Sequence, residues 1–255
     1  MSTELLEINI INLTKKYNNF LVFNNLNLNF KNDFINFLVS ENGSGKSTLI
    51  KCILKLIKFK GEITTNCKTM SYCPDKINLP DFITIEYFLS LFNIDQNKAS
   101  VLLSQFKLKK ELHVNELSKG MHQKLLIIQC LCKDADVYLF DEPLNGLDKN
   151  SENIFLKEIT ELFHKNKLII ISSHQIEHYF NMPLKIYNLK EVFSENCWSY
   201  ENPFHLSFFQ KKSANINFVY FNYLHIQHFY YLQYKDDCRQ YYRNYWCNLG
   251  NGIYI

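Results

Sequence analysis

The sequence predicts an α/β fold in which a mostly parallel sheet forms the core. Three nearly continuous apolar runs, at residues 34–39, 137–140 and 168–171, have the length of buried strands. Segments with apolar residues at helical spacing follow the first two runs, which is typical of parallel strands joined by crossover helices. An alternating apolar pattern in residues 5–30 predicts an N-terminal antiparallel β subdomain, and residues 76–120 predict a small α-helical subdomain.

Composition limits the classes of partner. The chain has 255 residues, enough for one large domain or two small ones, and its net charge of +3 is too small to indicate nucleic acid as a partner. The N-terminus is acidic and lacks a long apolar segment, so we expect no signal peptide. The eight cysteines show no C-x-x-C spacing. We therefore expect reduced, mostly buried cysteines in a cytosolic protein, with a zinc site as the less favoured alternative.

A loop rich in small residues joins the first apolar run to a helix. It consists of Ser40, Glu41, Asn42, Gly43, Ser44, Gly45, Lys46, Ser47 and Thr48. A helix N-terminus stabilises an anion, because it presents unpaired N–H groups and the positive end of the helix dipole. Gly43 and Gly45 let the backbone curl around phosphates. Lys46 would place a charge on the β and γ phosphates, and Ser47 would supply a hydroxyl for Mg²⁺. Strand, loop and helix together predict a phosphate-binding P-loop.

One position of this loop departs from the P-loop pattern, which begins with glycine where this chain has Ser40. If that position requires a positive φ, a residue with a Cβ costs roughly 1–2 kcal/mol, which would weaken nucleotide binding about tenfold. On the loop alone, a small-residue turn without a ligand stays an alternative.

The segments that flank the P-loop contain two further candidates. Tyr17 lies in the predicted turn between the first two strands, where its ring could stack on a nucleotide base or pack locally on the surface. Residues 61–63 and 69–73 predict two short strands, and Asp75 follows them in an irregular stretch.

Three polar residues are candidate helix caps. Thr84 and Asp95 precede two amphipathic segments between residues 84 and 113, and Ser118 can cap the apolar helix predicted at residues 124–132. The last of these would provide a second helix N-terminus that is able to face an anion.

The second and third apolar runs end in residues suited to catalysis. The second delivers Asp141 and Glu142, and burying two carboxylates is costly unless a cation lies there. In an α/β sheet the ligand crevice lies at that edge. Asp141 suits coordination of Mg²⁺ through water, and Glu142 suits activation of an attacking water. His174 follows the third run; a lone histidine is more often structural, but at this edge we expect it to contact a γ-phosphate.

The sequence changes character after residue 198, and residues 199–255 form an aromatic-rich extension of unknown role. Residues 213–234 carry no charge and are long enough to span a bilayer, but their amide and imidazole side chains disfavour a transmembrane helix. A metal site at His225, His228 and Cys238 is also disfavoured. We expect an extension that packs on the domain or on a partner, with a poorly ordered tail as the alternative.

Six ordered motifs over about residues 4–195 resemble the nucleotide-binding domain of the ABC transporter family. They are the A-loop aromatic Tyr17, the Walker A loop 40–48, the Q-loop position Asp75, the signature 117–121, Walker B with its glutamate at 137–142, and the D-loop 144–148 followed by the switch His174. The resemblance implies a P-loop NTPase core, an ATP-binding domain over residues 1–198, ATP and Mg²⁺ as cofactors, and ATPase activity.

The resemblance also implies a mechanism in which two such domains clasp head to tail around two ATP molecules. Each ATP would contact the Walker loops of one subunit and Ser118 and Gly120 of the other. Asp148 would link the two sites across the interface.

In this mechanism Glu142 would activate water, Lys46 would bind the phosphates and His174 would hold the γ-phosphate. Ser47, Asp141 and Asp75 would hold Mg²⁺.

The departures from the family pattern are Ser40, the carboxylate of Asp75 where glutamine is usual, and Leu-Ser-Lys-Gly-Met where Leu-Ser-Gly-Gly-Gln is usual. Asp75 has the shorter reach to Mg²⁺ and adds a negative charge. We expect these departures to affect turnover and coupling more than ATP binding.

By this resemblance the chain would be the ATPase subunit of a transporter at the cytoplasmic face of the membrane. Its partners would be a separate transmembrane permease and a second ATP-binding subunit, in a homo- or heterodimer. The short helical insert favours efflux. The alternatives are a soluble ABC-type ATPase that is not coupled to transport, and a weakly active binding partner in a heterodimer, against which Glu142 and His174 argue.

Overall fold

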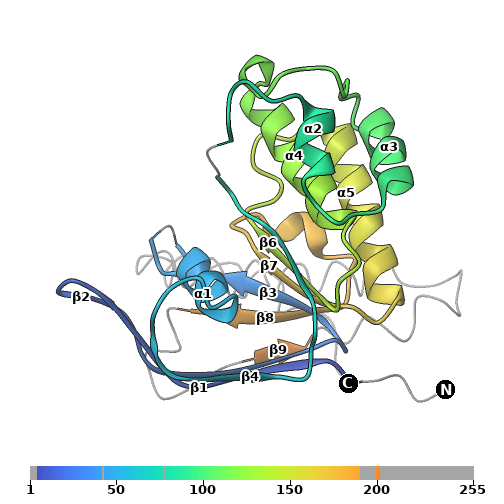
Figure 1. Ribbon diagram of the computed structural model, residues 1–255. Coiled ribbons are helices and arrows are strands. Elements are labelled where there is room, and N and C mark those ends of the chain that lie inside the picture. Colours follow the sequence, from blue (N-terminus) through green and yellow to red (C-terminus); the bar gives the residue numbers. More distant parts are fainter. Residues whose placement is uncertain (1–4, 42, 77–78, 190–198, 202–255) are drawn as a thin grey trace, which may run out of the picture. The chain divides into compact units, whose positions relative to one another are not determined.

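The computed structural model describes residues 5–41, 43–76, 79–189 and 199–201. These residues form a three-stranded antiparallel sheet, a six-stranded and mostly parallel sheet, and five α-helices (Figure 1). The predicted α/β fold, with its N-terminal antiparallel subdomain and its small helical subdomain, is confirmed. Apart from residues 199–201, the extension lies outside the described residues, so the domain boundary after residue 198 stays a prediction.

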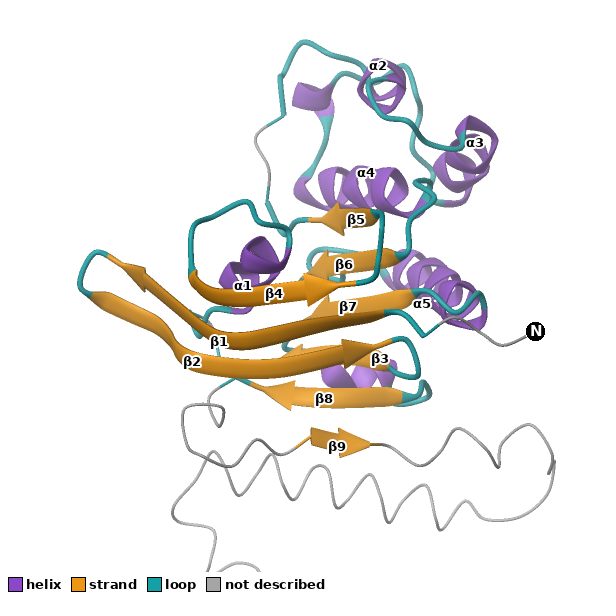
Figure 2. Cartoon of the chain, turned by 60° about the horizontal axis from the view of Figure 1, so that its bottom comes forward, coloured by secondary structure: helices purple, strands orange, loops and turns teal. Residues whose placement is uncertain are grey.

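The antiparallel sheet has the strand order β2–β1–β4 (Figure 2). Its strands are β1 at Glu7–Tyr17, β2 at Phe20–Lys31 and β4 at Lys60–Thr65. Most apolar residues of the alternating pattern face inward and are buried, among them Ile8, Ile10, Leu13, Phe23, Leu26 and Phe30, but Leu21 is 40% exposed. Tyr17 is the last residue of β1 and not part of the turn, which begins at Asn18 with a φ of +49°. Asparagine tolerates this left-handed conformation better than most residues.

Gly61, in β4, is a position where the fold requires glycine. Its φ is +100°, and a Cβ on it would lie 2.4 Å from the backbone oxygen of Asn12. Because that atom belongs to the backbone of the neighbouring strand, it cannot move aside without disturbing the β1–β4 pairing. We expect Gly61→Ala to lower the free energy of unfolding by about 3 kcal/mol or more, measured by urea denaturation without nucleotide.

Gly43→Ala is the matched control for that substitution. Gly43 also has a positive φ, +81°, but a Cβ there would meet no atom within 4 Å. The free energy of unfolding of Gly43→Ala should therefore fall only by the cost of the left-handed backbone, roughly 1–2 kcal/mol. Equal losses of unfolding free energy in the two variants would mean that the clash with Asn12 adds nothing to the cost of Gly61→Ala.

The second sheet has the strand order β5–β6–β7–β3–β8–β9. Its strands are β3 at Ile35–Val39, β5 at Met70–Cys73, β6 at Val137–Asp141, β7 at Leu168–Ser172, β8 at Leu184–Asn188 and β9 at Ser199–Glu201. The first five are parallel, and β9 runs antiparallel to β8. Every residue of β3, β6 and β7 is buried, which explains why these strands read as apolar runs. Their carboxyl ends meet at one edge of the sheet.

The helices divide into two groups. Helix α1 (Lys46–Ile53) follows β3, and α5 (Lys149–His164) joins β6 to β7. The helical subdomain contains α2 (Ile85–Ser90), α3 (Gln96–Gln105) and α4 (Lys119–Leu131), which Figure 1 shows grouped away from the antiparallel sheet. Short 3₁₀ turns lie at Val114–Glu116 and Ile176–Tyr179.

The three predicted helix caps are confirmed. The side chain of Thr84 accepts a hydrogen bond from the backbone N–H of residue 87, that of Asp95 from residues 97 and 98, and that of Ser118 from residue 121. Helix α4 begins at Lys119 and not at the predicted residue 124, so Ser118 of the signature caps it and residues 119–121 form its first turn. Within the described ranges, no helix combines the length and the apolar character that a membrane span needs.

Candidate functional site

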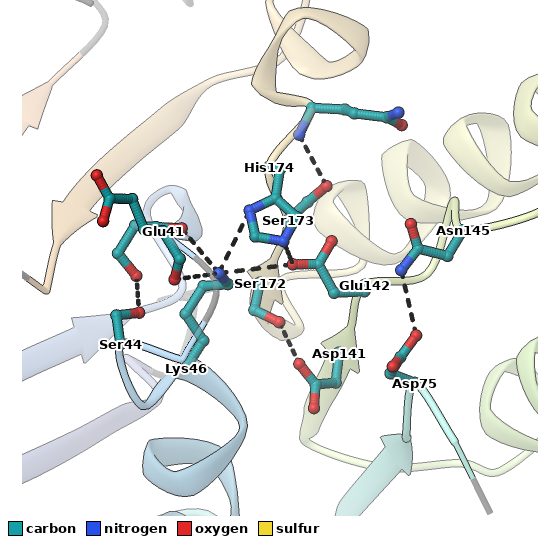
Figure 3. Close-up of polar contacts among 12 residues, drawn as sticks. Glu41, Ser44, Lys46, Asp75, Asp141, Glu142, Asn145, Ser172, Ser173 and His174 are labelled. Carbon is teal, nitrogen blue, oxygen red and sulfur yellow. Dashed lines mark hydrogen bonds and ion pairs between the residues drawn. The ribbon is translucent and has the colours of Figure 1, made fainter. Parts of the chain in front are cut away.

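Three of the predicted catalytic side chains meet at the carboxyl edge of the parallel sheet (Figure 3). Lys46 begins α1 after β3, Glu142 follows β6, and His174 follows β7. Glu142 Oε1 lies 3.6 Å from Lys46 Nζ and 2.9 Å from His174 Nε2. Lys46 Nζ lies 3.5 Å from His174 Nδ1. The structure thus gathers a cation, a carboxylate and an imidazole from segments that are far apart in the sequence.

Lys46 is a buried cation, with 6% of its surface exposed. Its ammonium donates hydrogen bonds to the backbone oxygens of Ser40, at 2.8 Å, and Glu41, at 3.3 Å. Burial lowers the pKa of Lys46, while the charges of Glu142 and Asp141 act in the opposite direction. Two backbone oxygens and a carboxylate therefore compensate a charge that would otherwise be expensive to bury.

The backbone of the P-loop explains one of its glycines. Gly45 has a φ of +103°, and a Cβ there would lie 2.7 Å from Cγ1 of Val22, so the antiparallel sheet leaves room for glycine alone. Thr48 lies in the first turn of α1, and Asn42 lies outside the described residues.

Ser40 fits the first position of the loop without backbone strain. Its φ is not positive, so the cost of a left-handed conformation does not arise. Its hydroxyl shares a hydrogen bond with the hydroxyl of Ser44, which ties the start of the loop to its middle.

A set of oxygen donors lies beside the cluster. Asp141 is 2% exposed, and its Oδ1 accepts a hydrogen bond of 2.5 Å from the hydroxyl of Ser172 on the neighbouring strand. Ser47, Asp75 and Asp141 line one cavity of about 1080 Å³. A hydroxyl and two carboxylates are donors that suit Mg²⁺, so these residues fit the ion expected from the sequence. One oxygen of Asp75 already accepts a hydrogen bond from the side chain of Asn145, at 3.2 Å.

Glu142 combines an unusual backbone with a perturbed carboxyl group. Its φ of +49° is left-handed, which is uncommon for a residue with a Cβ and turns the chain sharply after β6. Burial raises the pKa of Glu142, and the charges of His174 and Lys46 oppose this shift. A carboxylate with a raised pKa is a better proton acceptor near neutral pH than an ordinary glutamate.

The contacts of His174 favour one tautomer. For a neutral ring, a proton on Nε2 suits both neighbours, because Nδ1 can then accept from the Lys46 ammonium while Nε2, 2.9 Å from Glu142 Oε1, turns its N–H toward the carboxylate. The imidazole therefore bridges the cation and the carboxylate. Next to it, the hydroxyl of Ser173 accepts from the backbone N–H of Gln175 at 3.1 Å and fixes the turn.

Other predicted site residues lie away from this cluster. Tyr17 is at the end of β1 with 45% of its surface exposed, and the ammonium of Lys15 lies 4.4 Å from the centre of its ring. Ser118 and Gly120 are at the start of α4 in the helical subdomain. Asp148 caps α5 and forms an ion pair of 2.6 Å with Lys124.

Three polar side chains with contacts in or around the site were given no role by the sequence analysis: Ser172, Asn145 and Lys124. The hydroxyl of Ser172 could have been suspected, because it ends a strand at the same edge as Asp141. The other two could not, because their partners Asp75 and Asp148 come from distant segments whose approach depends on the tertiary fold.

The sequence is similar to that of known transport proteins. The family model described as ABC transporter matches residues 23–145. The zinc import ATP-binding protein ZnuC of Rickettsia conorii is 32% identical over 65% of this chain and 75% of that protein. The manganese transport system ATP-binding protein MntB of Bacillus subtilis is 27% identical over 76% of this chain and 90% of that protein.

Solved structures show the same fold. The ATP-binding subunit of an ABC transporter superposes with a TM-score of 0.65 at 24% identity, covering 71% of this chain and 85% of that one. A dimeric ATP-binding cassette in a post-hydrolysis state, bound to ADP and Pi, also gives 0.65, at 21% identity over 75% and 98% of the two chains. The chain therefore belongs to the ABC transporter family, as an ATP-binding subunit whose ATPase activity is coupled to transport.

Proposed function

We propose that this chain hydrolyses ATP with Mg²⁺ and thereby powers the import of a divalent metal ion through a separate membrane permease. The convergence of Lys46, Glu142 and His174 at one sheet edge carries the proposal of hydrolysis. The direction and the substrate class rest on relatives named for zinc import and manganese transport. The efflux direction favoured by the sequence analysis has no such support, so we replace it with import.

Each residue of the cluster has a distinct role in this proposal. ATP supplies the phosphoanhydride bond, and Lys46 binds its phosphates. Ser47 and Asp141 would hold Mg²⁺, which would supply positive charge beside those phosphates. Glu142 accepts a proton from the attacking water, and His174 turns its N–H from Glu142 to the γ-phosphate when ATP binds. Most of the rate enhancement would come from positioning and charge stabilisation.

The remaining predicted residues would complete the site. Tyr17 would stack on the adenine ring, and Asp75 would contact Mg²⁺ through water. Ser118 and Gly120 lie at the N-terminus of α4, which would point at the ATP held by a second ATP-binding subunit. The chain would therefore work as a head-to-tail dimer.

The permease would dock in the cavity that Asp75, Ser47 and Asp141 share with the helical subdomain. The same cavity is also lined by apolar side chains of and near α2, including Phe88, Leu91 and Phe92. Leu91 is 59% exposed, which is unusual for a leucine in a recess. A cytoplasmic segment of the permease that covered it would also touch residues next to the metal donors, so docking and hydrolysis would share one space.

Substituting Leu91 tests the function and the docking surface together. In cells whose metal uptake depends on this subunit, Leu91→Glu should abolish uptake of radioactive zinc or manganese, while phosphate release by the purified chain stays near the parental rate. The carboxylate introduced by Leu91→Glu would be buried without an ion-pair partner when the permease docks. Such a burial typically costs several kcal/mol of binding free energy.

Val101→Glu is the matched control, because Val101 is 56% exposed on α3 but does not line the cavity. It should leave uptake unchanged. Unchanged uptake in Leu91→Glu would contradict the docking surface. Phosphate release without uptake of either metal in the parental protein would favour an ATPase that is not coupled to metal import.

A further inference from the structure

The turn of residues 144–148, here called the central turn, joins β6 to α5 and touches other predicted site segments. It begins two residues after Glu142, so its position is set by the strand that carries the proposed base. Figure 3 shows its Asn145 directed at Asp75. Two further contacts connect it to α4, the helix that begins with the signature residues.

The first contact is between two backbones. A Cβ on Gly120 would lie 2.5 Å from the backbone oxygen of Gly146. No side chain longer than a hydrogen fits between them, so the first turn of α4 rests directly on the central turn.

The second contact is an ion pair one helical turn further along α4. Lys124 Nζ lies 2.6 Å from Asp148 Oδ2, and the lysine side chain is 14% exposed. Oδ1 of the same carboxylate accepts hydrogen bonds from the backbone N–H of Ser151, at 2.9 Å, and from its hydroxyl, at 3.0 Å. The Ser151 hydroxyl also lies 3.0 Å from Oδ2, so Asp148 holds the start of α5 through both oxygens and α4 through Oδ2.

Both contacts lie on one face of α4, because residues four apart on a helix are neighbours. The hydrogen bond from Lys124 is the largest cause of a lowered pKa at Asp148, followed by the one from Ser151. The carboxylate is thus paired with two groups of its own chain, although 56% of its side chain is exposed.

We propose that Lys124 and Asp148 are positioning residues that fasten the signature segment of α4 to the turn after Glu142 in the same chain. This rests on the proposed function, in which the signature residues serve the ATP of the partner subunit. The signature residues, which act on the ATP of the partner, then move together with Glu142, which acts on the ATP of the same chain. The family resemblance implied that Asp148 acts across the interface; here its two oxygens are engaged within the chain.

The kinetic test uses Lys124→Met and Asp148→Asn. Asparagine is also a good N-cap, so the second variant removes the charge and keeps the helix start. Each variant should lower kcat about tenfold, as expected for a displaced catalytic group, with the KM for ATP within about twofold. The double variant should be no slower than either single one, and Lys124→Arg should retain the parental kcat.

Lys149→Met is the control. It removes another ion pair, Lys149 to Glu152 at 3.0 Å, from the first turn of α5. It should leave kcat unchanged. Additive losses in the double variant, or an unchanged kcat in Lys124→Met, would overturn the proposal.

Mixed dimers show which site the pair serves. In a purified heterodimer of Lys46→Ala with Lys124→Met, the remaining competent P-loop faces an intact signature. Its rate should equal that of the heterodimer of Lys46→Ala with the parental chain. A rate about tenfold lower would mean that Lys124 acts on its own site, and the assignment to the signature would be wrong.

Hydrogen exchange separates this inference from the proposed function. Without nucleotide, the amides of residues 121–123 should exchange about fivefold faster in Lys124→Met and in Asp148→Asn than in the parental protein, and at the parental rate in Lys149→Met. Unchanged exchange in all variants would overturn the proposal that Lys124 and Asp148 fasten α4 to the central turn. A parental chain that exchanges as expected but hydrolyses no ATP would instead refute the proposed function.

Discussion

Glu142→Gln is expected to lower kcat for ATP hydrolysis by about 10²–10⁴-fold, the usual effect of losing a general base, while ATP still binds. The amide has the size of the native side chain, and its oxygen can still face Nε2 of His174, but it cannot take a proton from water. Because opening of the dimer would follow hydrolysis, an ATP-bound dimer should accumulate. Phosphate release and size-exclusion chromatography with ATP measure the two effects.

Glu152→Gln is the control for the change of charge. Glu152 is similarly shielded, paired with Lys149 at 3.0 Å and His178 at 3.4 Å, but it lies on α5 outside the cluster. It should hydrolyse ATP at close to the parental rate. If Glu142→Gln did so too, another group would have to activate the water.

Two inactive variants are expected to restore activity when they are combined. Lys46→Ala removes the phosphate-binding cation, and Ser118→Arg places a bulky cation at the N-terminus of α4. Each homodimer should lose more than about 90% of its hydrolysis, because every composite site carries a defect. A mixed dimer has one site with both defects and one with neither, so the mixture should regain a measurable part of the parental rate.

The control for the mixture is Lys46→Ala combined with Glu142→Gln. Both of these defects lie in the loops that hold a chain's own ATP, so no site in the mixed dimer is intact and no activity should return. A mixture of Lys46→Ala and Ser118→Arg that stays inactive, although mixed dimers form, would contradict the head-to-tail arrangement.

The strands could be predicted because burial on both faces requires an apolar residue at nearly every position. Their order in the sheet could not, because β3 lies between β7 and β8, and these pairings depend on packing between distant segments. The start of α4 was misplaced for a related reason. Gly120 disfavours a helix by itself, and its contact with Gly146 exists only in the folded chain.

The candidate site was predictable where it depended on strand ends. Lys46, Glu142 and His174 follow three buried strands, and parallel strands bring such residues to one edge. The left-handed backbone of Glu142 had no signal in the sequence, because glutamate is not a residue that marks such positions. The pairing of Asp148 with Lys124 was also hidden, since a surface aspartate after a turn usually indicates only a helix cap.

The central position of β3 has a consequence for the order of events during synthesis. This strand leads into the phosphate-binding loop, yet its two neighbours in the sheet are strands that begin only at Leu168 and Leu184. A nascent chain that has emerged as far as residue 165 contains the whole P-loop sequence, but β3 has no partner on either side. Such non-local pairings form slowly, because a long loop must close before any contact is gained. Nucleotide in the cell can therefore stabilise the folded domain by binding to it. It cannot do so during synthesis until the last strands have left the ribosome and the binding site has formed.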